Sequence, residues 1–533
     1  MVESVIKRVT NINNKDDKLS QLVGQFGTWQ LILFLSVFLV KLSSAWVQMA
    51  ILFLTPKFTF HCTQFAENSM VSTDLTSNST DFFTNSTDFA SKSTDFVSNS
   101  TDFVSNSTFL AEVSKCYKDC VNYEYDTSPM DSTIISEWDL VCERNWLASF
   151  TQMVLQSGIL IGSIVFGFLS DRYGRKKTFL AAVTITAIVG FAIPFSPNYI
   201  TFTILRFVSG FGCAGTMVVS FVLIMETVGP DYRELLGCTY QFPFIFGHMS
   251  IPLFAYYFRD WQTYSLAMAV PQALYLGYFF VLTESPRWLV SVGRVEQATA
   301  IVKRAAAINN RPTTKIEETL TKLSQDMRAA SEQPKPNYSA LFQRALLCKT
   351  LCCCFLWLIT GTTYFGFNQY ISQSSSDPFI SVAAAGAIQL PGVFLSMWLL
   401  KHLGRKKTTI LFFFLGGIFI LALGYVPKIF WLTLTLGSLG VSCAGAVACT
   451  IYIYTTELFP TVVRNMAMGA SSTSMRVGSM IAPFISNLSM TVPWLPTVIF
   501  GLAPITAGFV CFILPETRGK SLPDTLEDVK SSE

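Results

Sequence analysis

Charged residues are scarce in this chain: Asp, Glu, Lys and Arg make up only 14% of its 533 residues, while 51% are hydrophobic. A soluble protein has about 25% charged residues, so the composition excludes an ordinary soluble protein and predicts an integral membrane protein. The net charge of +3 is small, and the basic residues fall in short stretches between apolar runs. We therefore expect the lipid bilayer, and no nucleic acid, among the partners.

Histidine is rare as well, and the three residues, His61, His248 and His402, stand on separate segments. Nine of the 13 cysteines lie in apolar segments without the Cys-x-x-Cys and histidine spacing of a zinc site. The sequence also lacks a P-loop, a G-x-S-x-G motif and an HExxH motif. We expect no metal site, no cofactor, no catalytic residue and no enzymatic activity.

Long apolar runs, by contrast, are abundant, and twelve of them are long enough to cross a bilayer as helices. Basic stretches occupy alternate loops, so the positive-inside rule places both termini in the cytoplasm. The first run follows the polar arm 1–27 and is too long for the core of a cleavable signal peptide, which we do not expect. The chain is thus predicted to be an all-α, multi-pass membrane protein with helices at 28–54, 146–169, 178–196, 199–225, 235–257, 263–282, 345–370, 378–400, 408–426, 430–454, 466–490 and 494–514.

The two halves of the chain carry the same landmarks. DRYGRKK at Asp171–Lys177 recurs as KHLGRKK at Lys401–Lys407, ETVGPDYR recurs as ELFPTVVR, and TESPR recurs as PETR. The offsets are 230, 231 and 232 residues, which indicates a duplicated bundle of six helices. We predict a cytoplasmic arm at 1–27, bundles at 28–282 and 345–514, a cytoplasmic helical linker at 283–344 and a cytoplasmic tail at 515–533. In the linker, Val295, Ala298, Ile301, Val302 and Ala305 have the spacing of an amphipathic helix.

The loop 55–145 between the first two runs contains a seven-residue repeat that starts at Ser72 and continues to Ser107. The repeat has one apolar position in seven, so it has no seam for a coiled coil, and we interpret it as a disordered insert. It creates N-x-S/T acceptors that we expect to be glycosylated outside the cell, at Asn78, Asn85, Asn99 and Asn106. Four cysteines flank the repeat and can form disulfides in three pairings: Cys62, Cys116, Cys120 and Cys142.

Several of these segments resemble a known family. GFLSDRYGRKK (Gly167–Lys177) resembles the loop signature of the major facilitator superfamily. TESPRWL, YTTELFPTVVRN, IPLFAYYFRDW and the large cysteine-bearing loop together resemble its organic cation, carnitine and organic anion transporter branch, solute carrier family 22. The resemblance implies twelve helices in two pseudo-symmetric six-helix bundles, a central cavity and alternating access.

The resemblance also implies a gate built from the charges of the repeated loops: Asp171, Arg172, Arg175, Glu226, Arg233, Glu457 and Arg464. Ion pairs between the halves can latch one conformation and must break to release it. The alternative is that these charges only anchor the topology. Because Lys401 and His402 stand where the first half has Asp171 and Arg172, we expect the second latch to be asymmetric or weak.

Three ionisable residues fall near the middle of predicted membrane helices: Lys41, His248 and Arg476. A cation at that depth costs about 2.5–3.5 kcal/mol on insertion scales, so it usually faces a wet cavity and serves function. His248 shares a helix face with Gln241, and no Asp or Glu lies inside any of the twelve runs. A cavity with fixed positive charge and no carboxylate favours solutes that carry an anionic group.

The family comparison agrees with this interpretation. Cation-selective members of the resembled family place an acid where this chain has Arg476 and another where it has Gln389, whereas anion and carnitine carriers have Arg at the former position. The resemblance thus implies that Arg476 holds a carboxylate. The alternatives are that Arg476 is a structural lock on backbone carbonyls, and that Lys41 snorkels to the membrane surface.

Aromatic and amide side chains can bind the rest of a solute: Tyr240, Gln241, Tyr364, Phe367, Asn368 and Gln389. We therefore predict a plasma-membrane carrier of an organic anion or a carnitine-like zwitterion, with a small organic ion as substrate and a coupling or exchange ion left open. The alternatives are an organic cation carrier that uses only aromatic contacts, and a transport-dead receptor or adhesion glycoprotein. His248 is the one candidate for proton coupling at mid-membrane.

Overall fold

The computed structural model describes residues 18–56, 59–65, 116, 120–128, 130–331, 341–427, 429–460 and 463–518. The chain forms two compact units, a small one at 58–127 and a large one from the remaining residues. The seven-residue repeat and its four glycosylation motifs, at Asn78, Asn85, Asn99 and Asn106, lie outside the described residues.

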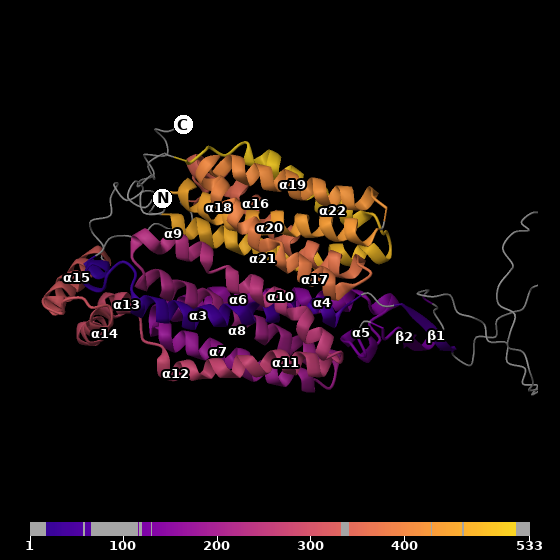
Figure 1. Cartoon of the computed structure of the whole chain (residues 1–533), viewed down its shortest axis with the longest axis horizontal. Coiled ribbons are helices and arrows are strands. Elements are labelled where there is room, and N and C mark those ends of the chain that lie inside the picture. The colour runs from indigo at the N-terminus through magenta and orange to yellow at the C-terminus, as the bar shows by residue number, and fades with distance from the viewer. Residues whose placement is uncertain are drawn as a thin grey trace, which may run out of the picture. The chain divides into compact units, whose positions relative to one another are not determined.

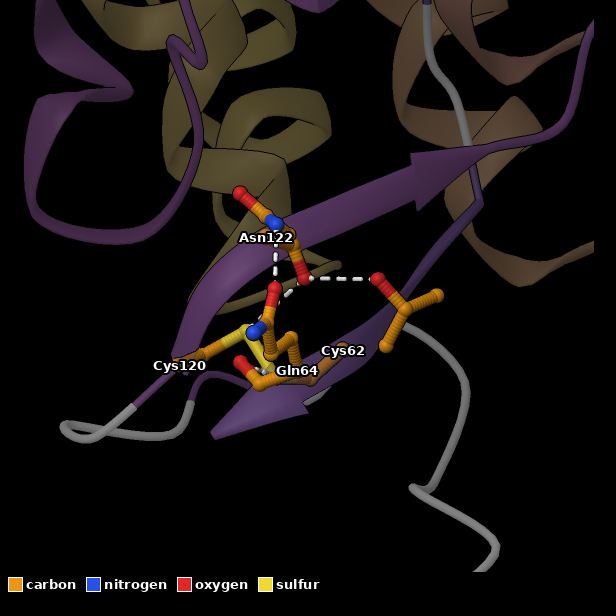
Figure 2. Close-up of a disulfide and its surroundings, with 5 residues drawn as sticks. Cys62, Gln64, Cys120 and Asn122 are labelled. Carbon is orange, nitrogen blue, oxygen red and sulfur yellow. Dashed lines mark hydrogen bonds between the residues drawn. A yellow bond between two sulfur atoms is a disulfide. The ribbon is translucent and has the colours of Figure 1, made fainter. Parts of the chain in front are cut away.

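The small unit is built on a β-hairpin that the apolar pattern of the sequence did not predict. Strand β1 (Phe60–Phe65) pairs antiparallel with β2 (Cys120–Tyr125). Cys62 and Cys120 form a disulfide with their Cα atoms 5.9 Å apart, and the Asn122 amide donates to Gln64 Oε1 at 2.7 Å beside it (Figure 2). Cys116 and, in the large unit, Cys142 each take part in a disulfide as well, so all four cysteines that the sequence singled out form disulfides.

Membrane helices make up most of the large unit. The first six are α3 (Thr28–Met49) with α4 (Ile51–Leu54), α6 (Trp146–Tyr173), α7 (Arg175–Ala192), α8 (Tyr199–Thr227), α9 (Pro230–Thr239) with α10 (Phe242–Tyr257), and α11 (Trp261–Ala273) with α12 (Tyr278–Val281). The last six are α16 (Arg344–Ser374), α17 (Pro378–Ala387) with α18 (Gln389–His402), α19 (Arg405–Tyr425), α20 (Phe430–Leu458), α21 (Arg464–Asn487) and α22 (Leu495–Cys511). Each predicted run thus contains a helix or a pair of helices.

Eight of these spans in the described part of the chain are both long and apolar enough to cross a membrane by themselves. The fifth is interrupted at Tyr240 and Gln241, and the sixth is interrupted by a 3₁₀ turn after Pro271. The eleventh, α21, is too polar, and the twelfth, α22, has only 17 residues. Each of these four spans contains a proline inside a helix: Pro252, Pro271, Pro483 and Pro504.

The two halves pack by equivalent contacts. Helix α10 approaches α3 at Gly247, where an added Cβ would lie 2.3 Å from the Leu42 carbonyl oxygen. Helix α21 approaches α16 at Gly478, where a Cβ would lie 2.0 Å from the Leu358 oxygen. Only glycine allows backbones to come this close. Between the halves, α10 packs on α17 and α6 packs on α21 (Figure 1).

Helices α13 (Pro286–Ser291), α14 (Val295–Ile308) and α15 (Ile316–Ser331) form the linker and pack with α2 (Lys18–Val23) at one end of the bundles, which we term the linker end (Figure 1). Ala298, Val302 and Ala305 on α14 are fully buried, as the amphipathic spacing indicates. Asn309 joins this cluster to the first span, because its Oδ1 accepts from Trp29 N at 2.9 Å. A further short helix of the large unit is α5 (Ile134–Glu137).

Candidate functional site

A cavity between the two halves is the candidate functional site. It comprises about 670 Å³ of empty space, including the part open to solvent, and receives side chains from α3, α8, α10, α16, α18, α20 and α21. Of the residues predicted to bind a solute, five line it: Lys41, Gln241, Tyr364, Gln389 and Arg476.

The other four predicted binding residues stand behind this lining. His248 is fully buried on α10, and its Nδ1 lies 3.1 Å from the amide nitrogen of Gln389 in the opposite half. The Asn368 amide donates to the Tyr364 carbonyl at 2.7 Å. Phe367 packs on Phe500, and Tyr240 lies beneath Lys41. These four residues position the lining rather than form it.

Arg476 lies at mid-length of α21 and lines the cavity with its side chain partly exposed. Its Nη1 lies 3.5 Å from the Gln48 side-chain oxygen, which is a long contact to a neutral acceptor. The described residues that line the cavity include no Asp or Glu. The guanidinium is therefore held by a neutral amide and keeps donors available for a ligand.

Lys41 reaches the same cavity from α3 in the other half. Its Nζ lies 4.9 Å from the centre of the Tyr240 ring and 5.7 Å from the centre of the Phe244 ring. Like Arg476, it has no acidic partner among the described residues that line the cavity. Two cations from opposite halves thus face one space, which gives it a positive electrostatic potential.

Gln389 is fixed at the centre of the cavity wall by three hydrogen bonds. Its Oε1 accepts from the Tyr364 hydroxyl at 3.0 Å, and its Nε2 donates to the Ala385 carbonyl at 2.9 Å and to His248 Nδ1. Because Nδ1 accepts, the neutral imidazole carries its proton on Nε2. A polar bridge therefore crosses between the halves at mid-depth.

The first membrane helix is interrupted beside this cavity. Ala50 N bonds the Trp46 carbonyl, and the next helical turn starts with Leu54 N bonding the Ala50 carbonyl. The freed Val47 carbonyl instead accepts from Arg206 Nη1 at 3.3 Å. The neighbouring carbonyl of Gln48 accepts from the Gln152 amide at 3.1 Å, and Arg206 Nη2 donates to Gln152 Oε1 at 2.6 Å. A buried guanidinium thus stabilises the break.

At the linker end, each half contains a cluster of one arginine and two glutamates. Arg175 binds Glu226 with contacts down to 2.6 Å, and Arg405 binds Glu457 at 2.9 Å. Glu284 caps α7 by accepting from Arg175 N at 2.8 Å, and Glu516 caps α19 in the same way at 2.9 Å. Arg405 was not among the predicted gate residues, although the offset of 230 residues from Arg175 pointed to it.

The other predicted gate residues have contacts within their own half. Asp171 pairs with Arg175 at 3.0 Å, and Arg172 lies over the Tyr173 ring. Arg233 donates to the carbonyls of Met225 and Val228, and Arg464 donates to the carbonyl of Phe459. In this conformation each of these contacts joins two residues of the same half.

The halves are joined at the opposite end of the bundle. Asn145 donates to Asn487 at 3.0 Å, and Ser149 donates to the Pro483 carbonyl at 3.1 Å. At the neighbouring helix ends, Ser372 donates to the Leu52 carbonyl at 3.2 Å. The cavity is thus bounded by contacts between the halves on the side away from the linker.

Comparison with known proteins identifies the family. The model of the sugar (and other) transporter family matches residues 94–528. The chain is 34% identical to the organic cation transporter protein of Drosophila melanogaster, over 77% of this chain and 76% of that protein. It is equally 34% identical to the organic cation/carnitine transporter 2 of Mus musculus, over 76% and 73% of the two chains. The chain belongs to the major facilitator superfamily, in its organic cation, carnitine and organic anion transporter branch.

The solved structure of the xylose transporter XylE from E. coli in an inward open conformation has the same fold. It aligns with a TM-score of 0.60 and 17% identity over 95% of this chain and 99% of that chain. The transporter therefore has the twelve-helix major facilitator fold in two pseudo-symmetric bundles, as the repeated landmarks predicted. It is a multi-pass membrane protein and not an enzyme.

The glycine of each repeated loop motif is fixed by backbone geometry. In the transporter Gly174 and Gly404 have φ of +104° and +96°, and at Gly404 an added Cβ would lie 2.8 Å from Glu516 Oε2. We expect Gly404→Ala to lower the free energy of unfolding by about 1–3 kcal/mol, because that backbone region is essentially reserved for glycine. Thermal unfolding in detergent measures this. The matched control is Gly469→Ala on α21, where an added Cβ meets no atom within 4 Å; equal stability of the two variants would contradict the expectation.

Proposed function

We propose that the transporter carries small organic ions that bear a carboxylate, either organic anions or carnitine-like zwitterions, by alternating access. The strongest support is that Arg476 and Lys41 line the same cavity, whose described lining has no acidic residue. A carboxylate that enters this space gains charge-assisted hydrogen bonds at low local dielectric, whereas a pure cation meets two like charges.

In this proposal Arg476 holds the carboxylate, because a guanidinium presents paired donors that match the two oxygens. Gln389 and Tyr364 orient the rest of the solute, since both are held by hydrogen bonds at fixed positions in the wall. Tyr452 and Phe244 add aromatic surface next to these polar groups. Gln241 offers a further amide on the other side of the cavity.

The name of one relative supports a zwitterionic solute. That relative is named for organic cations and carnitine, and carnitine is a zwitterion with a carboxylate and a quaternary ammonium group. Only the carboxylate of a zwitterion can pair with the cations of the cavity, as the carboxylate of an organic anion does. Both classes of solute therefore need a carboxylate to bind.

The arrangement of contacts suggests how access alternates. We infer that the linker end is cytoplasmic, because basic residues gather there, and that the chain lies in the plasma membrane with both termini inside the cell. Contacts between the halves then close the extracellular side, and the state is inward-facing. The clusters of Arg175 with Glu226 and Arg405 with Glu457 would form the cytoplasmic gate by exchanging partners between the halves when that side closes.

A competition panel tests the proposal. A labelled carboxylate that accumulates in cells expressing the protein is challenged with an anion, a zwitterion and tetraethylammonium. We expect the first two to inhibit. Arg476→Gln should lower uptake at least about tenfold, since a charge-assisted hydrogen bond contributes about 1.5–3 kcal/mol. Arg476→Lys should retain part of it.

Ser474→Ala is the matched control, because Ser474 lies on the same helix and donates to the Ala470 carbonyl without lining the cavity. Inhibition by tetraethylammonium alone would favour a cation carrier, for which the aromatic lining at Phe244, Tyr364 and Tyr452 is the supporting observation. No accumulation of any tracer by protein present at the cell surface would favour a receptor or adhesion glycoprotein and overturn the proposal.

A further inference from the structure

Two aromatic rings beside Lys41, Phe244 in the cavity lining and Tyr240 directly behind it, form a surface suited to a cation. Tyr240 is held in place because its hydroxyl lies 2.5 Å from Ser220 Oγ and donates to the Met217 carbonyl at 3.2 Å. Phe244 lies four residues further along, in the first turn of α10, and lines the cavity. The faces of such rings attract ammonium and quaternary ammonium groups.

The ammonium group of Lys41 already lies on these rings, at 4.9 Å from one centre and 5.7 Å from the other. The Lys41 side chain is only 6% exposed, and no hydrogen bond or ion pair joins it to another described residue. The rings are therefore its partners, and they compensate part of the cost of taking the charge out of water.

We propose that Lys41 occupies the cation subsite of the cavity as a tethered ligand, and thereby makes the transporter select against purely cationic solutes. The inference deepens the proposed function, on which it rests, by assigning the charge selectivity of the same cavity to one side chain. A tethered group competes at a high effective concentration, so a free cation must displace it before it can reach the rings. A displaced ammonium then repels the incoming cation at short range.

A neutral residue at position 41 would leave the rings free. The proposal predicts that Lys41→Gln and Lys41→Met bind tetraethylammonium at least about tenfold more tightly than the wild type, because a cation–π contact is gained and a repulsion is lost. Lys41→Arg should behave like the wild type, since it keeps a cation on the rings. If Lys41 served only to attract anions, its loss would weaken carboxylate binding without creating a site for cations.

The experiment measures binding of tetraethylammonium to purified full-length protein by its thermal shift, and uptake of labelled tetraethylammonium into cells, normalised to protein at the surface. Tyr240→Leu added to Lys41→Gln should remove the gain, because it removes the ring that the cation would contact. Lys303→Gln is the matched control, as Lys303 is 50% exposed on α14 and pairs with Glu317 at 3.7 Å away from the cavity.

Both Lys41→Gln and Lys41→Met are measured, so that if one of them folds poorly the other still tests the proposal. A tenfold gain that Tyr240→Leu abolishes supports the proposal. Unchanged tetraethylammonium binding in a folded neutral variant overturns it, as does a gain that persists without the Tyr240 ring. Uptake of a labelled carboxylate by the wild type is recorded separately. Its absence would count against the proposed function, while the thermal shift with tetraethylammonium would still decide the role of Lys41.

Discussion

Replacing Arg405 by methionine is expected to lower uptake at least about tenfold and to lower the free energy of unfolding by about 2–4 kcal/mol. The side chains of Arg405 and Glu457 are only 21% and 19% exposed, and the guanidinium bonds both carboxylate oxygens. Without it, Glu457 keeps a partly buried charge, which the Thr517 hydroxyl contacts as a hydrogen-bond donor at 2.6 Å. Surface-normalised uptake and thermal unfolding measure the two effects.

A charge exchange separates the ion pair from other roles of the two residues. Arg405→Glu combined with Glu457→Arg should recover part of the stability that either single change loses, as expected for directly interacting side chains. Lys407→Met is the matched control, since Lys407 is an exposed cation two residues further along the same helix. Strictly additive losses in the double variant would show that the pair does not act as a unit.

Replacing Arg206, which lies within a membrane helix, by methionine is expected to lower stability and uptake about as much as Arg405→Met does. Arg206 is 3% exposed, and its loss leaves the Val47 carbonyl and the Gln152 side-chain oxygen without their donor. A buried polar group without a partner costs about 1–3 kcal/mol, so two of them should lower stability by about 2–5 kcal/mol. Because these groups define the break in the first span beside Lys41 and Gln48, uptake should fall at least about tenfold.

Thr203→Val is the matched control for Arg206. Thr203 is also buried on α8, one turn away, but its hydroxyl is uncharged and makes a long hydrogen bond to Thr151, at 3.3 Å. We expect a loss below about 1.5 kcal/mol and near-normal uptake for this variant. Normal uptake and stability in Arg206→Met would show that the break in the first span needs no guanidinium.

The sequence predicted the membrane helices well because lipid leaves a chain little choice. A membrane span must form the hydrogen bonds of its backbone N–H and C=O groups within itself, so every apolar run of sufficient length becomes helical. The repeat then placed equivalent residues in both halves: Gly174 and Gly404 adopt the same backbone conformation 230 residues apart. The same offset joins Arg405 to Arg175, a match that could have been made from the sequence alone.

The cavity lining was only partly predictable. Helical spacing shows which residues share a face, but it does not show how far that face is rotated toward the interior. Tyr364 and Phe367 were both predicted to bind a solute, but Tyr364 lines the cavity while Phe367 packs on Phe500. Phe244 and Tyr452 had no distinguishing signal among 46 Phe and 18 Tyr.

The break at Ala50 had no signal in the sequence either. Helix breaks are usually marked by proline or glycine, and neither occurs between Thr28 and Thr55. The carbonyls are freed because Arg206 and Gln152, which are distant in sequence, compete for them. A tertiary contact of this kind cannot be inferred from local periodicity.

The charge of the cavity is the central claim, and a structure of the transporter with a bound carboxylate solute tests it most directly. The account predicts that the carboxylate oxygens lie within about 3 Å of the Arg476 guanidinium, with Lys41 still on the rings of Tyr240 and Phe244. A solute bound with its carboxylate away from Arg476, or with a cationic group against the rings in place of Lys41, would contradict it.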